Sequence, residues 1–500
     1  MAGVDGLQIG SPVSSTKSPP MEEPSALGAD WSKLPADILN AIQAELEFPD
    51  LFRSAAVCPS WRAAARCLRR HGLYSRPQTP CLLYSTAAAG TRAAEIYSLA
   101  DKSAYIIPLP DPPFAERSIV GSSHGWLVTA DARSELHLLN PTTGEQLALP
   151  PVATIEQVSP VLDDAGNLQR YDLSFYDATL PRKEDQPPQP YAVDRLRRVL
   201  YLKVVLSCDP SRGDCILMMI HNPYRQLSFA RVGSNKWHWI TTSFWESQYS
   251  DCIYHDGAFY AMNLLGGIHR YTIEGSCATR DIIFKDTLPY MAYNMYIART
   301  SSGDFLQIWR ITTDSSKDSL ETHTTDLEIF KVDLDKQQTV DIDTLNGDSL
   351  FIGHNYSCCI STKDYPGLQP NHVYFTDDDE YSLMDEQDFR RDVGIYSFEN
   401  KSATEVVTPE PWLSRPIPIW ITPSFTKVNK PPVQTLYHCF HSKRGEARAS
   451  THRASPGSRD CPRLHCMSSP SSTTPSLAWC SPRTPTPASS RAGPPHRPSR

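Results

Sequence analysis

Apolar residues recur at helical spacing in one short stretch near the amino end of the chain. A helix is predicted to begin at Leu34–Pro35, because proline fits the first helical position, where its missing N–H is not needed. The apolar residues that share one face of this helix are Ile38, Leu39, Ile42 and Leu46. The pattern therefore predicts an amphipathic helix with one face against other apolar surface.

Two further short helices are predicted directly after the first. Asp50 is placed to cap one of them, and Pro59 opens the other, which Gly72 is expected to end. The apolar residues of these two helices are Leu51, Phe52, Ala55, Ala56, Trp61, Ala64, Ala65 and Leu68. Three helices of this size cannot bury enough surface alone, so we expect their outer apolar side chains to contact a partner.

The pattern changes after Gly72, where short apolar runs alternate with Gly, Pro, Asn and Asp. The predicted strands are Cys81–Ser85, Ala94–Leu99, Trp126–Ala130, Glu135–Leu139, Val199–Leu206, Cys215–Ile220, Gln226–Val232, Asp251–Tyr254, Ala258–Asn263, Ile268–Ile273, Met295–Thr300, Phe305–Ile311, Leu327–Val332, Ser349–Ile352, His372–Phe375 and Gly394–Phe398. Such a series is typical of an all-β sandwich, barrel or propeller. The number of strands favours a propeller, whose blades repeat around an axis.

A weak internal repeat supports the propeller. One unit runs from Gly121 to Leu149 and contains three short strands, separated by polar turns at Asp131–Ser134 and Asn140–Gly144. Similar units start near Val204, Asp251, Ile297 and Ser349. Their spacing of roughly 40–50 residues is in the range of propeller blades.

Composition divides the chain into four parts. Residues 1–29 are rich in Ser, Pro, Gly and Ala and are expected to be a disordered leader, followed by the helical module at 30–72 and the β domain at 80–425. Residues 441–500 contain 13 Ser, 10 Pro and 9 Arg, and this tail of net charge +8 is also expected to be disordered. Because the whole chain carries −8, the first 440 residues hold −16.

Charge and cysteine content exclude several classes of protein. The negative net charge argues against general nucleic-acid binding. The 13 cysteines lack the dense spacing of a secreted disulfide scaffold, and the first residues do not resemble a signal peptide. The longest aliphatic run, Ile216–Ile220, is too short to cross a membrane. We therefore expect an intracellular protein without a membrane segment, in the cytoplasm or the nucleus.

The helical stretch LPADILNAIQAELEFPDLFRSAAVCPSWR resembles an F-box, the motif that binds the Skp1 adaptor of cullin–RING ubiquitin ligases. The matching positions are Leu34, Pro35, Ile38, Leu39, Ile42, Leu46, Asp50, Leu51, Val57, Cys58, Trp61 and Arg62. One departure is Glu47-Phe48-Pro49, since family members often have proline directly after the position of Leu46.

The β region also resembles a known family. The segments SSHGWLVTADARSELHLLNPTTGEQLALPPV, NHVYFTDDDE, DVGIYSFENKSATEV and PIPIWITPSF are similar to the plant DUF295 family, whose domain is described as a KIB-type β-propeller. Members commonly carry an N-terminal F-box, so the two resemblances reinforce each other. Together they imply a mainly β plant protein with a small three-helix F-box in front of a β-propeller-like domain.

The resemblance implies a substrate-recognition subunit of a Skp1–cullin–F-box ubiquitin ligase, with an unknown target on the propeller. The residues expected to divide between the Skp1 contact and the module's own core are Leu34, Pro35, Ile38, Leu39, Ile42, Leu46, Leu51, Val57 and Trp61. No catalytic residue, cofactor or metal is expected. The alternative is a ligase-independent binding scaffold with a degenerate F-box, which the departure at Glu47–Pro49 favours.

Two motifs offer candidate chemistry in the β region. Gly121-Ser122-Ser123-His124-Gly125 satisfies the nucleophile-elbow pattern G-x-S-x-G, but a strand rather than the required helix follows, so its glycines are interpreted as turn or bulge positions. Asp377-Asp378-Asp379-Glu380 could bind calcium or a basic partner, and a solvated loop is the default interpretation. The adjacent Cys358 and Cys359 are expected on opposite faces of one strand, as buried thiols.

Overall fold

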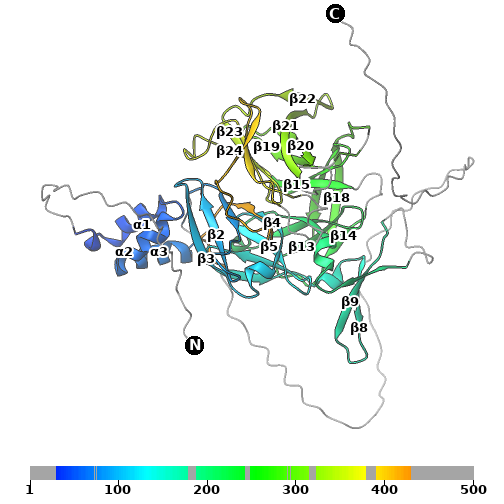
Figure 1. The fold of residues 1–500 in the computed structure, drawn as a ribbon, viewed down its shortest axis with the longest axis horizontal. Helices are drawn as coiled ribbons and strands as arrows, with labels where there is room; N and C mark the ends of the chain where they lie inside the picture. The colour runs from blue at the N-terminus through cyan, green and yellow to red at the C-terminus, as the bar shows by residue number, and fades with distance from the viewer. Residues whose placement is uncertain are drawn as a thin grey trace, which may run out of the picture. The chain divides into compact units, whose positions relative to one another are not determined.

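The computed structural model describes residues 30–71, 74, 76–177, 187–241, 248–289, 291–292, 294–314, 322–378 and 390–428. The predicted leader at 1–29, the helix stop at Gly72 and the tail at 441–500 lie outside the described residues. The amino-terminal part is helical, with a 3-10 turn η1 at Trp31–Lys33 and helices α1 (Ala36–Ala44), α2 (Asp50–Val57) and α3 (Pro59–His71) (Figure 1).

The helices begin close to where the sequence predicts. Pro59 is the first residue of α3, as expected, whereas α1 begins one residue later than predicted and has Pro35 at its N-cap. Asp50 is the first residue of α2 rather than its cap, which is Pro49. Its carboxylate accepts a hydrogen bond of 2.8 Å from Nη1 of Arg53, one turn further on.

The β region of the described chain consists of five four-stranded sheets, one five-stranded sheet and one three-stranded sheet. We number the six larger sheets as blades 1 to 6 in chain order. Blade 1 contains β28 (Ile419–Ile421), β1 (Cys81–Tyr84), β2 (Ala93–Ser98) and β3 (Ser103–Pro108); blade 2 contains β4 (Ser118–Ser123), β5 (Trp126–Ala130), β6 (Leu136–Asn140) and β7 (Glu145–Ala148); blade 3 contains β11 (Tyr201–Leu206), β12 (Ile216–His221), β13 (Gln226–Arg231) and β14 (His238–Ile240).

The second half of the domain contains three further blades of four or five strands each. Blade 4 contains β15 (Tyr249–His255), β16 (Ala258–Asn263), β17 (Ile268–Glu274) and β18 (Cys277–Phe284); blade 5 contains β19 (Met295–Arg299), β20 (Phe305–Asp314), β21 (Thr322–Asp333) and β22 (Gln338–Ile342); blade 6 contains β24 (Cys358–Ser361), β23 (Asp348–Ile352), β25 (His372–Phe375), β26 (Gly394–Ser397) and β27 (Ser402–Glu405). The three-stranded sheet of β8 (Val158–Leu162), β9 (Leu168–Leu173) and β10 (Gln189–Ala192) is inserted between blades 2 and 3.

The blades surround a common axis. The first strands of blades 2 to 5, which are β4, β11, β15 and β19, contact one another in succession, and β28 contacts β4. Blade 1 is closed by the carboxyl-terminal strand, because β28 pairs antiparallel with β1 at Leu82↔Trp420. This closure confirms the predicted mainly β architecture of propeller type behind a small helical module.

Apolar side chains fill the space between neighbouring blades. One cluster contains Trp126 of blade 2 and Val204 of blade 3, and further clusters lie between each following pair of blades around to blades 6 and 1. The cluster between blades 1 and 2 also takes in residues of the F-box-like helices, among them Phe48 and Leu51. The helices are therefore packed on the propeller through a shared core. No helix within the described ranges is long and apolar enough to cross a bilayer.

Candidate functional site

The helical module leaves several apolar side chains in contact with solvent. Trp31 in η1 is 62% exposed, Ile38 in α1 is 46% exposed and Val57 at the end of α2 is 65% exposed. Pro35 is exposed as well. Apolar side chains of this size, gathered in a module of about 40 residues, are typical of a surface that another molecule covers. We call these four residues the outer residues of the module.

The segment that carries the outer residues is fixed by polar contacts to the start of α3. The indole Nε1 of Trp61 donates to the carbonyl of Trp31 at 3.1 Å, and Oγ of Ser60 donates to the carbonyl of Ser32 at 3.0 Å. From α1, Nε2 of the buried Gln43 donates to the carbonyl of Trp61 at 2.8 Å. These bonds hold η1 and α1 against α3, so the outer residues are presented on an ordered scaffold.

The nine residues predicted for Skp1 contact and core fall into three groups by burial. Pro35, Ile38 and Val57 are exposed; Leu34, Ile42, Leu46 and Trp61 are half-buried; Leu39 and Leu51 are buried. Leu51 belongs to the cluster that the module shares with blades 1 and 2, and Leu46 packs against that cluster. Leu51 is therefore covered by the shared core, and Leu46 is partly covered by it.

The departure Glu47-Phe48-Pro49 lies on the propeller side of the module. The carboxylate of Glu47 accepts hydrogen bonds from Oγ1 of Thr79 at 2.7 Å and from Nη2 of Arg76 at 3.2 Å. The backbone N–H of Phe48 donates to Oε1 of Gln78 at 2.7 Å, and its ring is buried against blade 1. The segment that departs from the family pattern therefore attaches the helices to the propeller.

An ion pair joins three blades close to the axis of the propeller. Nζ of Lys203 in β11 lies 2.6 Å from Oδ1 of Asp251 in β15, and both side chains are almost completely buried. The other oxygen of Asp251 accepts a hydrogen bond of 2.7 Å from Oγ of Ser357, which precedes β24 of blade 6. Burial raises the pKa of Asp251, and the Lys203 ammonium opposes that shift. The pair links blades 3, 4 and 6 through charge rather than apolar packing.

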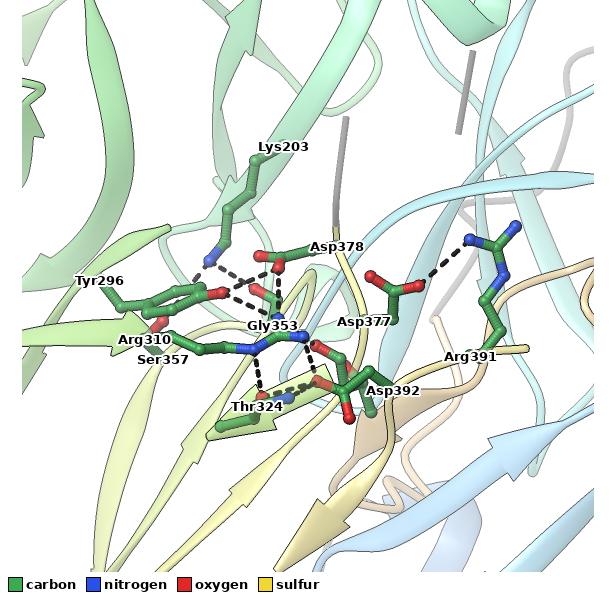
Figure 2. A network of polar contacts seen from close by, with 11 residues as sticks. Lys203, Tyr296, Arg310, Thr324, Gly353, Ser357, Asp377, Asp378, Arg391 and Asp392 are labelled. Atoms are coloured by element: carbon green, nitrogen blue, oxygen red, sulfur yellow. Dashed lines mark hydrogen bonds and ion pairs between the residues drawn. The ribbon is translucent and has the colours of Figure 1, made fainter. Parts of the chain in front are cut away.

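A second buried network is centred on Arg310 of β20. Its Nη1 lies 3.0 Å from Asp378 and its Nη2 lies 2.8 Å from Asp392. Oγ1 of Thr324 donates to Asp392 at 2.6 Å, and the hydroxyl of Tyr296 donates to Asp378 at 2.7 Å (Figure 2). Burial alone would lower the pKa of Arg310, but these neighbouring charges outweigh it and raise the pKa above its ordinary value. The guanidinium stays charged and ties blade 5 to blade 6.

The predicted solvated loop at Asp377–Glu380 is wrong for its first two residues. Asp377 is buried and forms an ion pair of 3.2 Å with Arg391, while Asp378 is bound to Arg310. Asp379 and Glu380 lie outside the described residues. Arg391, which lies 14 residues after Asp377, and Arg310 of blade 5 neutralise the first two carboxylates, so neither calcium nor a basic partner is needed to explain them.

The G-x-S-x-G motif forms a hairpin between two strands and has no helix after it. Gly121 lies where β4 comes close to β11, since a Cβ there would be 2.4 Å from the carbonyl oxygen of Val204. Gly125, with φ of +81°, follows the turn into β5. The interpretation of both glycines as turn or bulge positions is confirmed. Cys358 and Cys359 in β24 pack into different apolar clusters, as expected for opposite faces.

The network residues Lys203, Asp251 and Arg310 were missed by the sequence analysis. Each is a single charge inside an apolar strand pattern, as in the segment Tyr201–Leu206, and such a charge is a sign of a buried partner. Among the described residues no group of three or more His, Cys, Asp or Glu is arranged to hold a metal ion. The networks are therefore interpreted as structural.

Comparisons with known proteins agree with both parts of the chain. The family model KIB1-4 beta-propeller matches residues 96–397, and the F-box domain model matches residues 31–71. Among curated relatives from Arabidopsis thaliana, "Putative F-box protein At5g55150" is 21% identical over 79% of this chain and 98% of its own length. "F-box only protein 7" is 23% identical over 70% and 86% of the two chains, and "F-box protein SKIP23" is 24% identical over 79% and 96%. The first model spans more than half of the 500 residues, so the chain belongs to the KIB1-4 beta-propeller family, with an F-box domain in front of the propeller.

Proposed function

We propose that this protein is a substrate-recognition subunit of a Skp1–cullin–F-box ubiquitin ligase. In this proposal the F-box binds a Skp1-type adaptor inside the cell, and through it a cullin, while the propeller binds the target. The observation that supports it is the exposure of Trp31, Ile38 and Val57 on a module that is itself anchored to the propeller. Covering these three half-exposed side chains contributes on the order of 1 kcal/mol each.

The two sides of the F-box have different tasks in this proposal. Phe48 and Leu51 are covered by the chain's own propeller, so they are not available to an adaptor. The outer residues, together with the half-buried Leu34, Ile42 and Trp61, form the adaptor surface. The alternative of a ligase-independent scaffold drew on the departure at Glu47–Pro49. Because that segment contacts the propeller, it leaves the adaptor surface unaltered and gives no reason to prefer the scaffold.

The protein performs no bond-making chemistry of its own in this proposal. A propeller-bound target and an adaptor-bound ligase share one rigid chain, because the F-box and blades 1 and 2 have a common core. Tethering of this kind raises the effective concentration of the target near the ubiquitin-carrying enzyme. A rigid connection also restricts which lysines of the target are within reach.

The double substitution Leu34→Ala with Pro35→Ala is expected to abolish co-purification of a Skp1-type adaptor with the full chain. Leu34 and Pro35 precede α1 and do not belong to the core that the module shares with the propeller, so their loss removes adaptor contacts and leaves that core intact. The measurement is the amount of adaptor and cullin recovered with the tagged protein from plant cells.

A matched control truncates two exposed apolar side chains of the propeller, Ile282→Ala with Leu334→Ala. The control is expected to recover as much adaptor as the unaltered chain, and circular dichroism should show all three proteins folded. Equal recovery by the Leu34/Pro35 variant would refute the assignment of these residues, and absence of any adaptor on the unaltered chain would refute the ligase function.

A further inference from the structure

A cavity whose wall includes five arginines opens at one end of the propeller axis. The titratable side chains of the wall are those of Arg117, Arg197, Arg198, Arg391, Arg415, His354 and Glu116. Most of the wall is formed by the segments that enter the innermost strands β4, β11 and β28, which therefore meet at the same end of the axis, and His354 after β23 and Arg391 before β26 complete it. Its volume of about 80 Å³ is several times the roughly 10–15 Å³ that one water requires by this measure.

Three of these arginines have no carboxylate partner within the described part of the chain. Arg117 is buried, and its guanidinium donates to neutral acceptors only, including Oγ1 of Thr129 at 3.1 Å and Oε1 of Gln146 at 2.8 Å. Arg197 donates to backbone carbonyls, the shortest bond being 2.6 Å to Glu116. The side chain of Arg198 forms no recorded hydrogen bond or ion pair with the described residues. Asp131 acts electrostatically on Arg117 and Arg197 without forming an ion pair with either, so part of the positive charge in the wall has no direct counter-ion, which is costly unless an anion binds there.

Two buried polar atoms in the same wall lack a partner among the described residues. Arg391 is 1% exposed, and its Nη1 binds Asp377 (Figure 2). Its Nε donates to the carbonyl of Ser414, but Nη2 has no hydrogen-bond acceptor among the described residues. Nε2 of His354, which is 5% exposed, is also without a partner. Burial lowers the pKa of His354 to about 4, so at neutral pH it is an uncharged donor or acceptor. A water or an anion would satisfy the open Nη2 of Arg391.

This arginine-rich cavity differs in charge from the rest of the chain, which is negative. The first 440 residues carry −16, so the general field of the protein repels anions. An anion would therefore bind here only through contacts with the cavity itself. The planar guanidinium group of arginine forms bidentate hydrogen bonds with the oxygens of a phosphate. Among the described residues of the wall, Glu116 is the one carboxylate side chain, and it is exposed.

We propose that this cavity binds a phosphate group, either free or as a monoester on a larger molecule. Nη2 of Arg391 and the guanidinium of Arg198 donate hydrogen bonds to the phosphate oxygens. Arg117 and Arg197 attract the phosphate electrostatically without binding it directly. The site belongs to the propeller alone, so it stands whether or not the F-box binds an adaptor.

The test is calorimetric titration of the full chain with inorganic phosphate at constant ionic strength. We expect saturable binding that weakens about tenfold in Arg198→Gln, since one charged hydrogen bond is lost. Arg212→Gln, an exposed arginine beyond the opposite end of β11, is the matched control and should bind as the unaltered chain does. Arg391→Lys keeps a cation beside Asp377 but removes the open Nη2, so it should also bind more weakly while remaining folded.

A second arm replaces phosphate by a phosphoserine heptapeptide and its unphosphorylated counterpart. Tighter binding of the phosphopeptide than of inorganic phosphate assigns the site to a phosphorylated protein, and equal binding assigns it to a free or small phosphate. Absence of saturable binding of either probe, or unaltered binding by both Arg198→Gln and Arg391→Lys, would overturn the proposal.

Discussion

Replacing Asp251 by asparagine is expected to lower the free energy of unfolding of the propeller by about 3–5 kcal/mol. Asparagine preserves the shape of the side chain and an acceptor for the backbone N–H of Ile297, which lies 3.1 Å from Oδ2. What it removes is the negative charge 2.6 Å from Nζ of Lys203. The remaining ammonium is then buried without a counter-ion, so its desolvation free energy is no longer offset by a neighbouring charge. Chemical denaturation of the full chain measures the loss.

The double variant Lys203→Met with Asp251→Asn tests the physical reason. Removing both charges takes away the unpaired ion, so the double variant should be more stable than Asp251→Asn alone. The exposed pair Lys336–Asp333 is the matched control, because solvent screens it and Asp333→Asn should leave the unfolding midpoint almost unchanged. If Asp251→Asn were as stable as the unaltered chain, the buried ion pair would not have the stabilising role assigned to it.

The second large effect is expected from Phe48→Ala in the segment that joins the F-box to the propeller. Truncating a buried phenylalanine costs about 3–5 kcal/mol. The ring lies edge-on to Phe52 of α2 at 5.9 Å and to Tyr105 of blade 1 at 5.8 Å, so its loss opens the contact between the two parts. Residues 30–71 should become sensitive to limited proteolysis, while the propeller keeps its protection.

Phe330→Ala on blade 5 is the matched control for this variant. Phe330 packs against Trp309, away from the helices, at a ring distance of 4.9 Å. It should leave the protease protection of the F-box unchanged. Equal sensitivity of the F-box in the two variants, or none in Phe48→Ala, would show that the shared core does not hold the helices.

Much of the fold follows from local patterns in the sequence. The strands β5 at Trp126–Ala130 and β16 at Ala258–Asn263 begin and end where predicted, because inner and middle strands of a blade are apolar on both faces. The outermost strand β27 at Ser402–Glu405 is wholly exposed, so it has no apolar alternation to reveal it. The short closing strand β28 is defined by its pairing with β1, more than 330 residues away in sequence, which no local pattern contains.

The site is less predictable than the fold. The apolar positions of the F-box are visible as a motif, but whether Ile38 or Leu51 faces solvent depends on where the propeller lies, and the structure covers only Leu51. The partners of Asp377 and Asp378 are arginines from distant or opposing segments, so the sequence alone could not distinguish a buried network from a solvated acidic loop. Unpaired arginines likewise become informative only when a cavity brings them together.

The most direct test of the proposed function is hydrogen exchange of the full chain, alone and with a saturating Skp1-type adaptor. The account predicts slower amide exchange in the presence of the adaptor for residues 31–44 and 55–61, which carry the outer residues. It predicts no further change for residues 46–52, which contain the contacts to the propeller and of which Asp50 alone is exposed. Unchanged exchange in residues 31–44 and 55–61, or protection confined to the propeller, would contradict an adaptor surface on the outer side of the F-box.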